Sequence, residues 1–283
     1  MNDKNLHIDK LTGAQDDFFA KAEPDFERSA DDVLNNLMGK LGNETSNTIS
    51  RTLSFKVYAV AAIMVILLSV GAIMRFYTTN IRSARGEHLV FSLPDGSSIS
   101  LNAQSSIAYH PYWWWSKREL KLDGEAFFEV TKGEEFTVVS RLAKTMVLGT
   151  SFNIFARKGK YKVDCYTGKV RVVSNKNKEV ILTPSYSAEI QDDGNVLLKK
   201  FGDKKHGSGW MNKMFSFTSV PLVEVIKEVE RQFDITIEGD ISADLVYTGN
   251  FSANRNVDET LQLLCKPFGL EFQKVDDRVY RLK

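Results

Sequence analysis

The segment VYAVAAIMVILLSVGAIM, from Val57 to Met74, decides how the rest of the chain is interpreted. Its eighteen residues contain no charge, and Lys56 and Arg75 bound it. As a helix rising about 1.5 Å per residue it is roughly 27 Å long, close to the hydrocarbon thickness of a bilayer. Because a long, mostly polar stretch precedes it, a cleaved signal peptide does not fit. The segment predicts a single-pass membrane protein with a transmembrane helix over 56–75.

The charges divide at this segment. The whole chain carries a net charge of +1, whereas residues 1–55 contain six Lys and Arg against ten Asp and Glu, which leaves the tail at −4 and the remainder at +5. Basic residues flank the apolar segment equally, so the positive-inside rule does not assign an orientation. A short tail before it and a long strand-rich region after it favour a cytoplasmic tail. An acidic tail suits a basic partner protein better than DNA.

The tail, residues 1–55, contains one amphipathic pattern. Ser29 is a candidate N-cap, and apolar residues follow it at helical spacing until Gly39 and Gly42. A single helix of this length is marginal in water. Either the tail folds on itself as a small two-helix unit or its apolar face binds a groove on a partner, and we favour the partner. The candidate partner-binding residues are Phe18, Phe19, Phe26, Val33, Leu34, Leu37, Met38 and Leu41.

Residues 89–198 consist of short apolar segments separated by turns, after a linker over 76–88. The Pro94–Ser97 turn is typical, since proline presets φ and glycine tolerates positive φ. Strands of three to six residues at near-regular spacing predict an all-β region, either a sandwich, a barrel or a solenoid.

The run Trp113–Trp115 within this region has two interpretations. Consecutive strand residues point to opposite faces, so alternate rings would be core and the others would cover a turn. The alternative is an aromatic platform for a glycan or for the membrane interface. We favour the first.

Residues 214–283 follow a second linker, 199–213, and change pattern. Apolar residues recur at helical spacing after Pro221 and again after Asn256, between strand-like segments. The order β-α-β-β-α-β-β predicts a small α+β domain whose two helices cover one face of a sheet, with edge strands available.

Nothing in the sequence nominates an enzyme site. The four histidines are scattered without an HExxH motif, and Cys165 and Cys265 lie a hundred positions apart. Gly207–Gly209 lacks the helix and lysine of a phosphate-binding loop. We therefore expect no catalytic residues, no cofactor and no metal.

Four ordered motifs recur along the strand-rich region: Phe91–Ala103, Leu122–Val130, Val147–Ile154 and Gly168–Val170. In these motifs and in its C-terminal part, the chain resembles FecR-type anti-sigma factors. The C-terminal part is similar to the small domain that follows FecR modules in Bacteroidetes-type members, and to the short domain of secretins and TonB-dependent receptors. Pro184-Ser185-Tyr186 departs from the usual Pro-Gly-Gln.

This resemblance implies a mechanism. The β region would be a twisted, solenoid-like periplasmic FecR module, and 214–283 would contact the signalling domain of a TonB-dependent outer-membrane transporter. The tail would hold an extracytoplasmic-function sigma factor, with the N-terminus cytoplasmic and the protein in the bacterial inner membrane. An intramembrane protease is a further implied partner. No direct nucleic-acid contact is implied.

The step Gly149–Thr150 matches a position where some family members are thought to break their own chain. A threonine hydroxyl can attack the preceding carbonyl if the backbone is strained. The simpler interpretation is a turn between strands, and we favour it.

Two functions remain beside the leading one. One is a membrane-anchored periplasmic module that binds glycan or cell wall, for which the tail would be dispensable. The other is an assembly factor that uses a sheet edge of the C-terminal domain.

Overall fold

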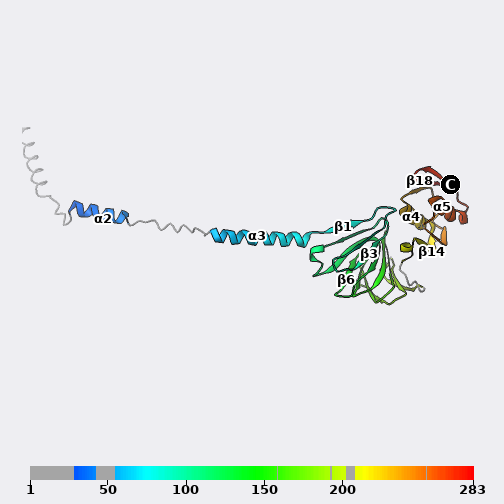
Figure 1. Ribbon diagram of the computed structural model, residues 1–283, viewed down its shortest axis with the longest axis horizontal. Helices are drawn as coiled ribbons and strands as arrows, with labels where there is room; N and C mark the ends of the chain where they lie inside the picture. Colours follow the sequence, from blue (N-terminus) through cyan, green and yellow to red (C-terminus); the bar gives the residue numbers. More distant parts are fainter. Residues whose placement is uncertain (1–28, 43–54, 158, 192, 202–207, 253) are drawn as a thin grey trace, which may run out of the picture. The chain divides into compact units, whose positions relative to one another are not determined.

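The computed structural model describes residues 29–42, 55–157, 159–191, 193–201, 208–252 and 254–283 (Figure 1). The chain divides into two compact units, residues 1–63 and 64–283, and the division falls within the long helix α3, Phe55–Phe76.

Helix α2 covers Ala30–Gly42, so Gly39 lies within the helix, and the residues that follow Gly42 lie outside the described part of the chain. Asp31 and Asp32 in its first turn and Lys40 in its last complement the helix dipole. None of its residues is buried. Of the candidate partner-binding residues, Phe18, Phe19 and Phe26 lie outside the described residues.

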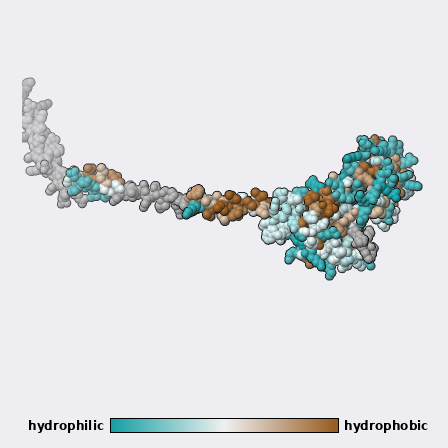
Figure 2. Space-filling view, viewed as in Figure 1, coloured by the Kyte–Doolittle hydropathy of each residue, from teal (hydrophilic) through white to brown (hydrophobic). Residues whose placement is uncertain are grey.

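Helix α3 contains 22 residues, about 33 Å at 1.5 Å per residue. Its mean hydropathy over an 18-residue window is 2.6, and none of that window is buried. Figure 2 shows its surface as brown, the hydrophobic end of the scale. Within the part of the chain that the structure describes, α3 is the one helix long and apolar enough to cross a membrane.

The strand-rich region forms one large sheet whose two branches share strand β5, Arg118–Glu129. The first half of β5 pairs with β4 and β6, and its second half pairs with β3 and β8. One branch runs β11-β10-β7-β6-β5 and the other β5-β8-β9-β12-β13. The remaining bounds are β1 Thr79–Arg82, β2 Leu89–Ser92, β3 Ser98–Leu101, β4 Ser106–Tyr109, β6 Phe136–Val139, β7 Ala143–Val147, β8 Ser151–Arg157, β9 Lys160–Cys165, β10 Val170–Ser174, β11 Glu179–Leu182, β12 Tyr186–Ile190 and β13 Val196–Lys200.

Successive hairpins alternate between the two branches, with β6–β7 and β10–β11 in one and β8–β9 and β12–β13 in the other. One apolar core lies between the branches, and its side chains come from both. The region is therefore all-β, as expected, and its sheet is close to a barrel. Fully buried side chains include Ile99, Leu120, Phe128, Phe136 and Phe152.

Residues 76–88, expected as a linker, are built into the fold instead. Strand β1 pairs antiparallel with β4, from Thr79 opposite Tyr109 to Arg82 opposite Ser106. The Ser83 hydroxyl donates to the Asn102 carbonyl at 2.5 Å, and the Gly86 N–H donates to the Arg231 carbonyl at 2.7 Å. The sequence did not reveal this strand for two reasons. The segment is polar, and its partner strand lies almost thirty residues further along the chain.

The tryptophan run does not lie in a strand. Pro111–Trp113 form a short 3-10 helix, η1, and a turn follows. Only the middle ring, Trp114, is buried, and it packs edge-on against Tyr109 and Phe136. Trp115 is 81% exposed. One ring is therefore core and the others surround a turn, as favoured, but the run lies in a 3-10 helix and a turn and not in the strand from which this was expected.

The C-terminal domain has the predicted order of elements, but its strands form two small sheets rather than one. Strands β14 and β16 pair antiparallel, and β18 lies between β15 and β17. One core joins them to both helices. The bounds are η2 Gly209–Asn212, β14 Met214–Pro221, α4 Leu222–Phe233, β15 Thr236–Glu238, β16 Val246–Ser252, α5 Val257–Cys265, η3 Lys266–Phe268, β17 Phe272–Asp276 and β18 Val279–Leu282.

Candidate functional site

Strand β5 is buried on both of its faces where the C-terminal domain meets the sheet. Ala126 and Phe128 face the core of the large sheet, and neither is exposed. The intervening side chains, Glu125 and Phe127, point to the opposite face, yet they are only 8% and 5% exposed. Phe127 belongs to the core cluster of the C-terminal domain. The second domain therefore covers this face of β5.

Glu125 is held by two amide side chains, Asn102 directly after β3 and Asn153 on β8. Asn102 Nδ2 donates to one carboxylate oxygen at 2.8 Å, and Asn153 Nδ2 donates to the other at 2.9 Å. Each amide is fixed by its own oxygen, because Asn102 Oδ1 accepts from Gln232 and Asn153 Oδ1 accepts from the Trp210 indole at 3.1 Å. The carboxylate thus sits in a preformed cradle that reaches into the second domain.

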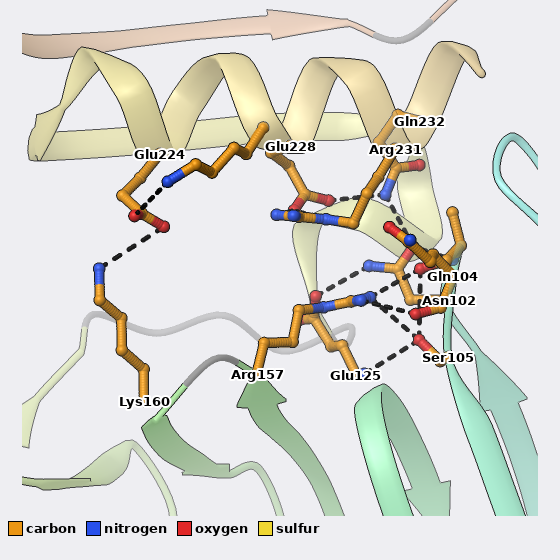
Figure 3. Close-up of polar contacts among 12 residues, drawn as sticks. Asn102, Gln104, Ser105, Glu125, Arg157, Lys160, Glu224, Glu228, Arg231 and Gln232 are labelled. Atoms are coloured by element: carbon orange, nitrogen blue, oxygen red, sulfur yellow. Dashed lines mark hydrogen bonds and ion pairs between the residues drawn. The ribbon is translucent and has the colours of Figure 1, made fainter. Parts of the chain in front are cut away.

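Helix α4 supplies the other side of this network (Figure 3). Arg231 donates to Glu228 at 2.5 Å, and both side chains are almost fully buried. Gln232 Nε2 donates to Glu228 at 2.7 Å and to Asn102 at 2.8 Å, so it links the two domains directly. His88 Nε2 donates to Gln232 Oε1 at 2.8 Å.

Arg157, on β8, adds a second buried cation. Its guanidinium donates to the carbonyls of Ala103 and Gln104, each at 2.7 Å, and to the Ser105 hydroxyl at 3.0 Å. The network contains two carboxylates, Glu125 and Glu228, and two guanidinium groups, Arg157 and Arg231. Buried charges persist only when they are paired and hydrogen-bonded, and this set is balanced in sign.

The environment raises the pKa of Glu125 from 4.5 to about 7. Burial is the main cause, and the charge of Glu228 acts in the same direction, whereas the Asn153 amide, Arg157 and the Asn102 amide oppose it. The contact between the domains therefore includes a carboxyl group that changes charge near neutral pH.

A cavity of about 350 Å³ lies beside the network. Glu125, Tyr166, Trp210, Glu228 and Arg231 are among its lining residues. Among the described residues, no group of three or more His, Cys, Asp or Glu side chains could hold a metal ion. The arrangement joins two domains through charge and hydrogen bonds, and it contains no nucleophile paired with a base.

The apolar residues predicted to bind a partner lie along α2 and are exposed. Val33, Leu34, Leu37, Met38 and Leu41 are 45% to 71% exposed. The helix brings them to one face, as their spacing predicted, and no described residue covers that face.

Gly149 and Thr150 connect β7 to β8, beside a pocket of about 610 Å³. Gly149 has a φ of +155°, and a Cβ there would lie 2.9 Å from the Lys132 Cα. The Thr150 side chain is buried, and its hydroxyl donates to the Lys169 carbonyl at 3.1 Å.

Sequence patterns did not reveal the interdomain network, although three of its members lie within the FecR-like motifs. Asn102, Glu125 and Asn153 each belong to a different motif. One signal was available: residues 125–128, Glu-Ala-Phe-Phe, lack the polar alternation of a strand that faces water on one side. Their partners on α4 are about a hundred residues away, so spacing alone could not reveal them.

Comparisons with known proteins agree with this architecture. A family model described as FecR protein matches residues 79–171, and one described as FecR, C-terminal, matches residues 214–281. No match was found among curated proteins.

Two crystal structures, at 2.50 Å and 1.65 Å resolution, are similar to this chain, and each is described as "a putative anti-sigma factor from Parabacteroides distasonis ATCC 8503". Each is 27% identical with a TM-score of 0.65. The matches cover 73% and 72% of this chain and 98% of each relative. The chain thus contains a FecR domain and a FecR C-terminal domain, and β5 of the first meets the second through a buried polar network. It belongs to the FecR family.

Proposed function

We propose that the chain is a membrane-anchored anti-sigma regulator that relays a signal from an outer-membrane TonB-dependent transporter to an extracytoplasmic-function sigma factor. FecR membership and the anti-sigma relatives support the regulatory role. The observation that carries the proposal is an uncovered apolar helix face on α2, separated from the FecR domain by a helix of membrane length.

Helix α3 spans the inner membrane in this proposal, with residues 1–55 in the cytoplasm and the two folded domains in the periplasm. Support comes from its length of about 33 Å, enough for a hydrocarbon core of about 30 Å, and from its exposure along the whole window. Extraction with carbonate tests the anchor, because a spanning helix stays in the membrane pellet. External protease on spheroplasts tests the side, since it should leave residues 1–55 intact.

The sigma factor binds the apolar face of α2. A helix of 13 residues is marginal alone and gains stability when its apolar face is buried against a partner. Leu34 and Leu37 lie at the centre of that face and are 55% and 52% exposed.

Co-purification of the full chain with the sigma factor encoded beside it tests this step. Leu34→Asp and Leu37→Asp should each abolish capture, because a charge would be buried in the complex. Asn36→Asp adds the same charge to the opposite face of α2 and should leave capture unchanged. Equal capture by all three variants would contradict the assigned face.

The C-terminal domain receives the signalling domain of the transporter. Its two small sheets leave strand edges without a partner among the described residues, and such edges can accept a further strand. Pull-down of the full chain with the isolated signalling domain tests the contact. A sigma-dependent transcriptional reporter separates this role from assembly of the transporter, because only signalling changes transcription.

Release of the tail follows removal of the periplasmic part and then cleavage by an intramembrane protease. Gly149–Thr150 remains a turn between strands in the favoured interpretation, and self-cleavage at this step is the alternative route to that removal. The buried hydroxyl of Thr150 and the backbone that only glycine tolerates at Gly149 are compatible with the step. Intact-mass analysis tests self-cleavage. Two fragments from the wild type and a single uncut chain from Thr150→Ala would support it. An uncut wild-type chain would end this part of the proposal.

A further inference from the structure

We propose that an aromatic collar docks the FecR domain onto the periplasmic surface of the membrane that holds α3. The collar consists of Tyr77, Tyr112, Trp113 and Trp115. This inference rests on the proposed role of α3 as a membrane anchor, and it assigns a partner, the lipid headgroup layer, to the part of the tryptophan run that the core does not use.

The connection between α3 and the FecR domain is too short to hold the domain away from the membrane. Only Tyr77 and Thr78 separate the end of α3 from the start of β1. The Tyr77 N–H donates to the Ile73 carbonyl at 2.9 Å, which continues the helix by one residue. The Tyr77 carbonyl in turn accepts from His110 Nδ1 at 2.9 Å. The exit of the helix is thus tied to the segment that follows β4.

The collar lies beside the last turn of α3. The Arg75 guanidinium carbon is 5.5 Å from the centroid of the Trp113 ring. The rings of Tyr77 and Tyr112 are 5.4 Å apart, and those of Trp113 and Trp115 are 5.7 Å apart. The headgroup layer extends roughly 5 to 8 Å beyond each side of the hydrocarbon core. If α3 fills the core, these rings lie within that layer.

The chemistry of the collar suits a lipid surface. Trp115 is 81% exposed and Tyr112 is 49% exposed, although the adjacent Trp114 is buried in the core. Tryptophan and tyrosine concentrate at headgroup level, where the ring is buried and its polar edge remains hydrated. Arg75 adds a planar cation of the kind that binds phosphate. Continuity with the exposed apolar surface of α3 selects the bilayer over other occupants.

Docking would place the chain between α3 and β1 within the headgroup layer. A protease needs an extended, accessible segment, and Tyr77–Thr78 would become accessible only when the collar leaves the surface. Contact with the membrane thus protects the anchor from cleavage.

Tryptophan fluorescence tests the proposal with the full chain in vesicles of phosphatidylethanolamine and phosphatidylglycerol that contain phosphatidylcholine brominated near the headgroup. Trp114 and Trp210 are buried within the protein, so Trp113 and Trp115 supply the emission that bromine can quench. We expect Trp115→Leu to remove about half of the quenched emission, since it removes one of two interfacial rings. Its melting temperature should not change, because the side chain is exposed.

The double variant Trp115→Leu/Val275→Trp is the matched control. It restores the number of tryptophans at an exposed position on β17, in the C-terminal domain. Quenching should stay at the level of Trp115→Leu, and its restoration would overturn the proposal.

Two further outcomes would also overturn it. One is an absence of quenching in a wild-type chain that resists carbonate extraction, in which case the anchor stands and only the docking fails. The other is a change in tryptophan emission when soluble peptidoglycan fragments are added, lost in Trp115→Leu, without any quenching by brominated lipid. That result would make a glycan the occupant of the collar. A chain that carbonate removes would instead contradict the proposed anchor itself.

Discussion

Helices α2 and α4 are similar in length and in the spacing of their apolar residues, but they differ in what covers them. In α4, Leu222, Val225, Ile226 and Val229 are at most 3% exposed, and two small sheets and α5 surround them. In α2 the five apolar residues are 45% to 71% exposed. The same pattern therefore serves two purposes: one helix completes a domain core, and the other presents an apolar face that nothing in the described chain covers.

The largest expected loss of stability comes from a charge on the buried face of α4. Val225→Asp places a charge at a position with no exposure, so we expect a loss of at least about 4 kcal/mol in unfolding free energy. Thermal melting of the full chain in detergent measures it. Leu34→Asp is the matching change on α2, and its melting temperature should equal that of the wild type. A large shift for Leu34→Asp would mean that the tail packs on itself.

The polar side of α4 should be nearly as sensitive. Arg231→Met leaves Glu228 buried without its partner, and we expect a loss of about 3 kcal/mol. Arg171→Met, which breaks the exposed pair with Glu135, should cost less than about 1 kcal/mol. Equal costs in denaturant titrations would show that the buried pair on α4 contributes no more than a surface pair.

Stability should also depend on pH through Glu125. Its pKa is raised from 4.5 to about 7 in the folded chain, so the folded state holds the proton more tightly than the unfolded state. This contribution is fully present below pH 4.5 and is lost as the pH rises through about 7, to a limit on the order of 3 kcal/mol at 1.36 kcal/mol per pKa unit.

Melting temperatures between pH 4 and pH 8 would check the dependence, with Glu125→Gln as the reference that lacks the titrating group. The difference between the two curves should grow across that window. Parallel curves would contradict the raised pKa.

The smallest structural effect concerns Gly149. Gly149→Ala introduces a Cβ that would lie 2.7 Å from the Lys132 side chain, at a φ of +155°, and we expect a loss of about 1 to 3 kcal/mol. Gly269→Ala has a φ of +67° but no atom within 4 Å, so it isolates the backbone cost alone, about 1 kcal/mol. Denaturant unfolding of both variants would test whether the close approach of Lys132 adds to that cost.

Local patterns predicted several parts of the fold. The all-β class of the FecR domain, the presence of α2 and the order of elements in the C-terminal domain follow from alternation, helical spacing and caps, which act over a few residues. Long-range pairing could not be predicted in this way. Strand β5 is continuous through Gly124, and at this glycine it passes from one branch to the other. A Cβ on Gly124 would lie 2.6 Å from the Ser105 Cα, so the close approach of the two backbones requires glycine.

The candidate site was less predictable than the fold. The exposed face of α2 depends on one helix and was predicted. The network of Glu125, Arg157, Glu228 and Arg231 depends on how two domains meet, and its hydrogen bonds join residues up to 144 positions apart. Single-sequence periodicity contains no information about such contacts.

Strand β1 has a mechanical consequence. It is four residues long and, among the described residues, pairs with β4 alone, whereas each half of β5 pairs with two strands. If α3 is held in a bilayer as proposed, tension on the chain enters the sheet at β1, the first strand after α3. Under load this short ladder would detach before the rest of the sheet, and the segment next to α3 would lengthen while the domain behind it stayed folded.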